Sequence, residues 1–478
     1  MPSSKAAQPA KKLPRSFKYG MPLYSVVWPE GSIFYVCGGG GSTSTGIKNR
    51  VVFAECISGH LTDQLGDFNF GPDCPMRMAI TPNMKSMVVA MGLGGIRRLE
   101  LDTRGKIPKL SEVSGDLAAR LKVEVAGEVK SLAFNRSGEQ LLLGWADGGL
   151  AVLDWPSLQP RLDLRSPSTR LADGVRDLDS SPTPRNHVVT CVLDNGTLEQ
   201  WDWESGRLVL RAGLARGEFR SNAVMTLVGP EHSSVQPLPR GLHGATFARA
   251  KYGPVPTKPG SSSSSSSGAG GRAGAGSSTP SPSASPLLYA LMNNREGCWA
   301  TQWAQPGGPA SLSLVKWRKV SGGPGSGLDV SRDGAKLAVS TSDGSTMVLS
   351  ASDLSTLNLL PKAHMVFSTG VVLAPDGSQA LSISADASAT AVPASKQPRL
   401  RVKTSAVGRV LLLTVIFIAL MLACALQVIR VLKWQGRMDL VWKLRSLMGW
   451  KGVPDGATLM PAGSQCPAGS VGQCQAGP

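Results

Sequence analysis

A short pattern of strands and turns recurs along the chain and restricts its fold more than any other feature. Each copy has a strand, a turn near glycine, a second strand, a turn of the Asp-Gly type and a third strand. Units of this kind, repeated every roughly 40–45 residues, are typical of β-propeller blades. The clearest copies span residues 131–155, 328–349 and 371–392, and weaker ones span 23–55, 78–101, 175–203 and 245–303. Seven copies predict an all-β, WD40-like, seven-bladed β-propeller over residues 20–395.

A sandwich of unrelated hairpins is the alternative fold, but the same turn residues recur from copy to copy, which favours the propeller. Residues 253–286 interrupt one copy and include seven consecutive serines, 261–267, among glycine, alanine and proline. Such a composition cannot bury enough apolar surface to offset the entropy of ordering. Because strand-like sequence resumes at Leu287, we expect a disordered insertion between two strands of one blade.

A long apolar run near the C-terminus predicts one transmembrane helix. Residues 410–429 are twenty residues without a charge between Arg409 and Arg430. A helix of about 20 apolar residues spans the ~30 Å hydrocarbon core of a bilayer, whereas a buried core helix seldom stays apolar on every face. Residues 396–409 form a basic linker before the helix. Residues 430–478 form a tail after it, with a predicted interfacial helix over 430–450.

The orientation of the predicted span does not follow from charge, because five basic residues lie before it and four after it, too small a bias to use. The first residues are polar and basic without an apolar segment, so we expect no cleaved signal peptide. Five of the eight cysteines lie in the propeller, an odd number without C-x-x-C spacing. This pattern favours reduced, buried thiols in the cytosol over a disulfide framework or a zinc site. Cys466 and Cys474 lie in the tail.

The net charge of +17 suggests nucleic-acid binding until its distribution is considered. Residues 1–19, a predicted disordered basic arm, hold five basic residues and no acid, and residues 396–451 carry a net charge of +10. The remainder of the chain therefore has a net charge of only +2. Because the large middle is nearly neutral, we expect no nucleic-acid partner.

A glycine-rich connection separates the first two predicted strands, 32–36 and 50–55. It contains Gly38-Gly39-Gly40-Gly41, a Ser/Thr run, and then Gly46-Ile47-Lys48-Asn49. Gly41 and Gly46 have the glycine spacing of a P-loop, but Ile47 stands where the lysine should be and a strand follows instead of a helix. The dinucleotide pattern G-x-G-x-x-G also fails at Thr43. Four bare glycines instead offer backbone that can approach an ion or a partner closely.

Hydrolytic chemistry has no support in the sequence. The five histidines show no i, i+4 pairing, and neither H-E-x-x-H nor G-x-S-x-G occurs. Acidic residues such as Asp147 and Asp343 fall at turns, where aspartate bonds to its own backbone. We therefore predict that the protein is not an enzyme that makes or breaks bonds.

The glycine motif, placed between the first two strands of a propeller with one C-terminal span, resembles a known family. This is the prolactin regulatory element-binding protein family, the endoplasmic-reticulum guanine nucleotide exchange factors for the GTPase of coat complex II. The resemblance covers about residues 20–430, with weaker support from Ala363-His364 before the last blade. The serine-rich insertion and the absence of a His-Asp-Glu-Leu-type ending depart from it.

The resemblance implies a single-pass protein of the endoplasmic-reticulum membrane with a cytosolic propeller and a lumenal tail. It implies that the propeller promotes GDP release from, and GTP loading of, a small Ras-like GTPase. In the family, the glycine loop wraps a potassium ion with backbone carbonyls, which here places Gly38, Gly39, Gly40, Gly41 and Gly46 around the ion. Asn49, with Ile47 beside it, is then the residue that reaches the GTPase.

Two other functions stay open at this stage. In the first, the propeller is a membrane-tethered scaffold that gathers other proteins and has no exchange activity. The second, DNA binding, is suggested only by the family name and is opposed by the neutral domain. Without the resemblance, Asn49 is simply a turn residue that precedes a strand.

Overall fold

The structure is a computed structural model that describes residues 14–42, 45–183, 186–214, 223–230, 233–255, 286–396 and 406–447. The chain divides into two compact units, residues 1–397 and residues 398–478. The predicted insertion, apart from its ends, and the C-terminal tail from residue 448 lie outside the described residues. So do residues 1–13 of the predicted basic arm.

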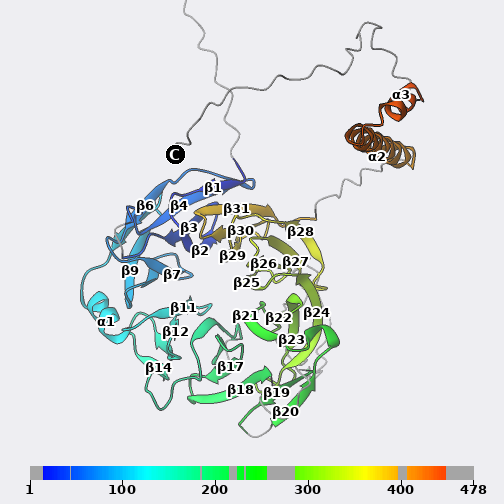
Figure 1. Ribbon diagram of the computed structural model, residues 1–478. Helices are drawn as coiled ribbons and strands as arrows, with labels where there is room; N and C mark the ends of the chain where they lie inside the picture. Colours follow the sequence, from blue (N-terminus) through cyan, green and yellow to red (C-terminus); the bar gives the residue numbers. More distant parts are fainter. Residues whose placement is uncertain are drawn as a thin grey trace, which may run out of the picture. The chain divides into compact units, whose positions relative to one another are not determined.

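The first unit is a ring of seven antiparallel sheets, which confirms the predicted seven-bladed propeller (Figure 1). The strands of each blade are given with the innermost strand first. Blade 1 contains β2 (Leu23–Glu30), β3 (Ile33–Gly38), β4 (Arg50–Ile57), β5 (His60–Leu61) and β6 (Gly66–Asn69), and blade 2 contains β7 (Pro75–Ile80), β8 (Ser86–Met91), β9 (Ile96–Asp102) and β10 (Lys109–Glu112). Blade 3 contains β11 (Val129–Phe134), β12 (Gln140–Trp145), β13 (Leu150–Asp154) and β14 (Pro160–Asp163).

Blade 4 has six strands, three more than the repeat pattern predicts. Its strands are β15 (Val175–Ser180), β16 (Val188–Leu193), β17 (Leu198–Asp202), β18 (Arg207–Leu214), β19 (Val224–Val228) and β20 (Ser233–Pro237). Blade 5 contains β21 (Thr246–Tyr252), β22 (Leu288–Asn294), β23 (Gly297–Ala304) and β24 (Ser313–Ser321), and blade 6 contains β25 (Gly325–Val330), β26 (Lys336–Thr341), β27 (Thr346–Ser350) and β28 (Thr356–Leu360). Blade 7 contains β29 (Ser368–Leu373), β30 (Gln379–Ser384), β31 (Ser388–Pro393) and β1 (Ser16–Lys18). Strands β21 and β22, which flank the serine-rich segment, pair with each other.

Ring closure depends on the N-terminal strand. β1 pairs antiparallel with β31 as the outermost strand of blade 7, with Ser16 opposite Thr390 and Lys18 opposite Ser388 (Figure 1). The propeller therefore begins before residue 20, and the predicted disordered arm is wrong for residues 16–18. The three-residue strand Ser-Phe-Lys has no sequence pattern of its own, because it is specified by the open edge of β31.

Apolar side chains from neighbouring blades form the core. The described residues contain seven buried clusters, one at each junction between adjacent blades. Trp303 is fully buried at the junction of blades 4 and 5. The five cysteines predicted to be buried thiols are indeed buried and free: Cys37, Cys56, Cys74, Cys191 and Cys298.

Polar side chains link the innermost strands of successive blades. Asp177 and Asp179 on β15 accept backbone N–H bonds from β21 in the next blade, at 3.1 and 2.8 Å. Arg77 and Arg249 lie at a central cavity of about 140 Å³. Their guanidinium groups donate to backbone carbonyls of the blades on both sides of their own. The centre of the ring is thus polar and cross-linked.

One face of the ring collects two kinds of connection, and we call it the loop face. Because the strands within a blade are antiparallel, the turn between its second and third strands lies at the same end as its connection to the next blade. Hydrogen bonds join the two kinds of connection, including Phe70 N to Asn49 O at 2.8 Å and His364 N to Gly344 O at 3.1 Å. Helix α1 (Asp116–Glu124) lies in one such connection, and a short 3-10 helix (Arg240–Leu242) in another.

The second unit consists of two helices, α2 (Ala406–Trp434) and α3 (Met438–Leu447). Residues Thr414–Trp434 of α2 have a mean hydropathy of 2.5 and are long and apolar enough to cross a membrane. The helix continues beyond the uncharged run at both ends, because flanking Arg and Lys residues are good helix formers. The predicted interfacial helix over 430–450 is divided within its described part, since Gly436, with a φ of +71°, separates the end of α2 from the start of α3.

Ring closure can be tested by truncation. Removing residues 1–18 deletes β1 and exposes the edge of β31, and we expect the free energy of unfolding to fall by at least about 2 kcal/mol. The matched control removes only residues 1–13 and keeps β1. Thermal unfolding and light scattering of both proteins measure the effect, and equal stability of the two truncations would show that β1 does not close the ring.

Candidate functional site

The glycine-rich connection is the turn between the second and third strands of blade 1, so it lies on the loop face. The strands on either side confirm the predicted strand–loop–strand order, and β4 follows the loop where a P-loop would open a helix. Gly38 belongs to β3 and pairs with Arg50, which removes it from the loop itself. A Cβ at Gly38 would lie 1.8 Å from the carbonyl oxygen of Pro22, so the close approach of two chain segments requires glycine there.

The other glycines allow the loop to fold back on itself. A Cβ at Gly39 would lie 2.1 Å from Asn49 Oδ1, and one at Gly40 would lie 2.0 Å from Thr45 Oγ1. Gly41 and Gly46 adopt φ values of +87° and +74°, which side chains disfavour. Close packing therefore accounts for glycine at positions 39 and 40, and the backbone conformation accounts for glycine at positions 41 and 46.

Asn49 lies inside the loop and holds it together. Its side-chain Oδ1 accepts the N–H of Gly41 at 3.1 Å, while Nδ2 donates to the carbonyls of Gly41 and Gly71 at 2.9 and 3.0 Å. Gly71 belongs to the connection toward blade 2, so one amide joins two segments of the loop face. Asn49 is only 3% exposed. In this conformation its amide is used within the propeller and does not project toward a partner.

Ile47 is the apolar side chain that the loop presents to solvent. It is 39% exposed, and its backbone N–H donates to Thr45 Oγ1 at 3.3 Å. Lys48 beside it is also exposed. The structure therefore brings Ile47 and Asn49 together in one loop but gives them opposite directions, Ile47 outward and Asn49 inward.

Backbone carbonyls of the loop are the candidate ligands for a cation. Gly39 O accepts the Tyr24 hydroxyl at 3.4 Å, and Gly41 O accepts the Asn49 amide. Uncharged carbonyl oxygens are the donors that potassium sites use, and each carbonyl has two lone pairs. A carbonyl that accepts one hydrogen bond can therefore also face an ion, so the chemical type of these donors is compatible with potassium. Among the described residues, no group of three or more His, Cys, Asp or Glu side chains could hold a metal.

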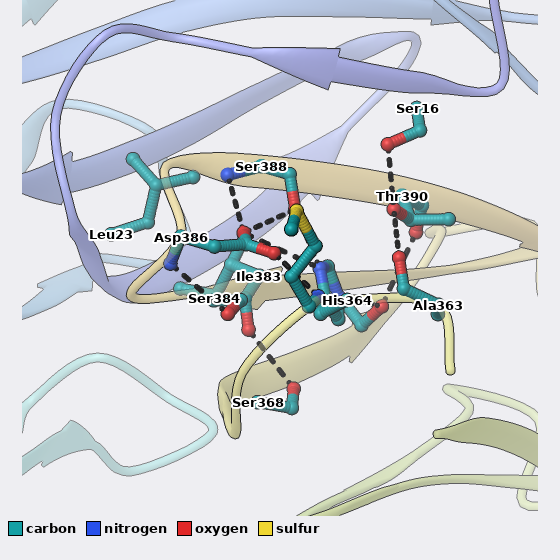
Figure 2. Close-up of polar contacts among 12 residues, drawn as sticks. Ser16, Leu23, Ala363, His364, Ser368, Ile383, Ser384, Asp386, Ser388 and Thr390 are labelled. Carbon is teal, nitrogen blue, oxygen red and sulfur yellow. Dashed lines mark hydrogen bonds and ion pairs between the residues drawn. The ribbon is translucent and has the colours of Figure 1, made fainter. Parts of the chain in front are cut away.

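A second polar cluster lies on the loop face at blade 7, around His364 (Figure 2). The His364 ring bonds to two hydroxyls, Nδ1 to Ser388 Oγ at 2.7 Å and Nε2 to Ser382 Oγ at 2.8 Å. Asp386 accepts the Ser388 hydroxyl, and its Oδ1 lies 3.9 Å from His364 Nδ1. Burial lowers the pKa of His364 to about 4, against the opposing effect of Asp386, so the ring is neutral at pH 7.

This Ser-His-Asp group has a structural role and is not a hydrolytic triad. Both ring nitrogens are engaged, and His364 is 4% exposed, so a substrate cannot reach the ring. The cluster instead holds the connection between β28 and β29. Asp386 Oδ2 accepts the N–H of Met365 at 2.7 Å, and Ser384 Oγ donates to the carbonyl of Phe367 at 2.9 Å.

Sequence reasoning noted Ala363-His364 but missed both the partners of His364 and the residues that the cluster holds. The only available signal was the apolar run Met365-Val366-Phe367, which directly follows His364 and lies between two copies of the repeat. In a sequence, such an apolar run has the same pattern as the start of a buried strand. Only the burial of its side chains in the structure distinguishes a buried strand from an exposed connection.

Comparisons with known proteins give one distant relative. No family model matches the chain. SEC12-like protein 2 of Arabidopsis thaliana is 22% identical over 357 residues, which is 72% of this chain and 72% of the relative. This similarity and the seven-bladed fold support the family resemblance of the chain at a coarse level.

The pKa of His364 leads to a prediction about pH. Because the folded-state pKa of about 4 lies below the ordinary value of 6.5, the unfolded chain binds the proton more readily. The contribution of His364 to stability is complete above pH 6.5 and is lost as the pH falls toward 4. A shift of this size corresponds to roughly 3 kcal/mol at most.

The measurement compares the free energy of unfolding of the detergent-solubilised protein and of His364→Gln at pH 7.5 and pH 4.5. The wild type should lose more stability between these values than the variant. Asp329 has a pKa raised to about 6 by burial and so acts in the opposite direction, but it is present in both proteins. Equal losses would rule out a buried neutral histidine.

Proposed function

We propose that this protein is a guanine nucleotide exchange factor. Its partner is the small Ras-like GTPase that starts coat complex II budding at the endoplasmic reticulum, and it promotes GDP release and GTP loading. The observation that carries the proposal is the similarity to SEC12-like protein 2 over 72% of both chains. The glycine motif supplies further support, because it resembles the loop of the exchange-factor family. Its residues Ile47 and Lys48 are exposed on the loop face.

The mechanism is differential binding and needs no bond-breaking group. A factor that binds the nucleotide-free GTPase more tightly than the GDP-bound form lowers the affinity for GDP by the same factor. In this proposal Ile47 enters the GTPase near its nucleotide. Asn49 is a positioning residue, because its three hydrogen bonds hold the backbone that carries Ile47. To touch the GTPase itself, the Asn49 amide would have to leave Gly41 and Gly71.

A membrane anchor would hold the exchange reaction at the membrane surface. In the proposal α2 spans the endoplasmic-reticulum membrane once and the propeller faces the cytosol, where the GTPase meets it. Free, buried cysteines in the propeller agree with a reducing compartment. Exchange would then produce the GTP-bound form at the membrane on which a coat assembles.

A membrane-anchored scaffold without exchange activity is the second candidate. The observation in its favour is the burial of Asn49, whose amide is used inside the propeller in this conformation. A scaffold would bind its partners without changing how quickly the GTPase releases GDP. Nucleotide release therefore separates the two functions.

The exchange proposal predicts different effects for the two loop residues. Ile47→Ala should slow GDP release at saturating factor by about tenfold or more, as for a central interface residue, with unchanged stability. Asn49→Ala should slow release and also lower the free energy of unfolding by about 1–3 kcal/mol, because buried backbone groups lose their partner. Release of a fluorescent GDP analogue and thermal unfolding measure both effects.

The control for these variants is Ile57→Ala. Ile57 is 48% exposed and lies at the opposite end of β4, so its truncation removes a similar apolar surface from the other face. If the wild type does not accelerate release, or if Ile47→Ala is as fast as the wild type, the proposed mechanism is wrong.

The potassium proposal can be tested on the loop itself. Lys48 is an exposed trypsin site within the loop, and an ion that bridges the carbonyls should slow cleavage there. Cleavage after Lys48 should therefore be several-fold slower in potassium chloride than in choline chloride of the same ionic strength. Arg104, whose side chain is 90% exposed in blade 2, serves as the internal control site. The same rate at Lys48 in both salts would exclude the ion.

A further inference from the structure

Three consecutive apolar side chains lie open to solvent on the loop face. Met365, Val366 and Phe367, which we call the apolar patch, are 84%, 42% and 54% exposed in the connection between β28 and β29. Single exposed apolar residues are common on soluble domains, but a contiguous group on one loop is typical of a binding surface. Nothing in the ring requires this connection to be apolar, because its side chains point away from the core.

The apolar patch is held in one conformation before any partner arrives. Asp386 accepts the backbone N–H of Met365, and Ser384 donates to the backbone carbonyl of Phe367. The buried His364, which precedes these residues in the chain, lies beside Asp386 (Figure 2). The N–H of His364 donates to Gly344 O in blade 6. A loop that is already ordered loses little conformational entropy on binding, which favours its use as an anchor.

A chain of hydrogen bonds, from both backbone and side-chain groups, joins the apolar patch to the glycine loop. Asp386, which holds Met365, is followed by Ala387, and Ala387 O accepts the N–H of Tyr19 at 2.9 Å. Arg50, the residue after Asn49, donates to Tyr19 O at 3.0 Å. Gly39 N donates to Pro22 O at 3.1 Å. The patch and Ile47 are therefore on neighbouring blades of the same face, with the segment 19–22 between them.

Exposed apolar surface also continues on the other side of the glycine loop. Leu93, in the turn between β8 and β9 of blade 2, is 68% exposed, and its N–H donates to Asp73 Oδ1 at 2.9 Å. It lines a groove of about 540 Å³ together with Arg97 and Lys122. At the opposite ends of the strands in blades 1 and 2, Ile57 ends β4 and Ile107 lies between β9 and β10, and both are exposed.

We propose that the apolar patch is a second docking site for the GTPase on which the glycine loop acts. This inference rests on the proposed function. A stable protein interface buries about 800 Å² on each partner, more than one short loop can supply, so a GTPase seated on Ile47 must cover neighbouring blades. The patch is an exposed apolar surface in the direction of blade 7, and hydrogen bonds hold its backbone. It sets the affinity for the GTPase through an apolar segment of that protein, whereas Ile47 sets the rate of release.

The test uses the full chain and the double variant Met365→Ala/Phe367→Ala. The KM of the exchange reaction for the GTPase should rise by about tenfold or more, with kcat unchanged, since two exposed anchors are lost. Binding of the nucleotide-free GTPase should weaken by the same factor. Ile47→Ala should show the opposite division, a lower kcat with little change in KM. The matched control is Ile57→Ala/Ile107→Ala, and thermal unfolding checks that all variants stay folded.

The outcomes separate this inference from the proposed function. If the wild type exchanges nucleotide and the patch variant has an unchanged KM, the docking site is wrong and the exchange function stands. If the wild type binds the GTPase without exchange and the patch variant loses that binding, the docking site stands and the exchange function fails. Neither binding nor exchange by the wild type overturns both.

A lipid contact is the other use of such a patch, and the same assay detects it. The measurement is made both in detergent micelles and in phosphatidylcholine vesicles. A GTPase contact should raise KM equally in both media. A rise in KM that occurs only in vesicles would assign the patch to the membrane and overturn the proposal.

Discussion

The pairing of β1 with β31 is the interaction on which the rest of the propeller depends. Without β1, the last blade would have an open edge and the first and last blades would not be joined through the chain. The residues directly after β1 also shape the functional face. Tyr19 accepts a bond from Arg50 and donates to Ala387, and Pro22 accepts the N–H of Gly39. The segment that closes the ring thus also supports the glycine loop on one side and the patch-bearing blade on the other.

The glycine loop shows how a small amount of buried polar chemistry can orient an exposed side chain. Glycine is costly in conformational entropy, and the loop offsets that cost with the hydrogen bonds of one buried amide, that of Asn49. The result is a backbone that carries Ile47 outward. The cluster at His364 follows the same logic, because buried polar groups fix a connection that presents Met365 and Phe367. Both loops have a polar interior and an apolar tip.

Most of the architecture could be predicted because it repeats. Alternating short strands and Asp-Gly turns identify the three inner strands of blades 3, 6 and 7, and the apolar run identifies α2. The parts that sequence reasoning missed are those without a local pattern. β1 is three residues long, and β19 and β20 are outer strands of blade 4 that follow the predicted copy 175–203 in the chain. A strand of this kind is specified by the edge that it pairs with, which lies elsewhere in the chain.

The sequence by itself determined the fold class, the number of blades, the apolar helix and the position of the glycine loop, because periodicity and composition are local properties. Only the tertiary structure decided that Asn49 points inward and Ile47 outward. It also decided that a histidine and an aspartate 22 residues apart together hold an exposed Met-Val-Phe run. Burial and hydrogen-bond partners depend on which segments the closed ring brings together, and this information is absent from any one stretch of the chain.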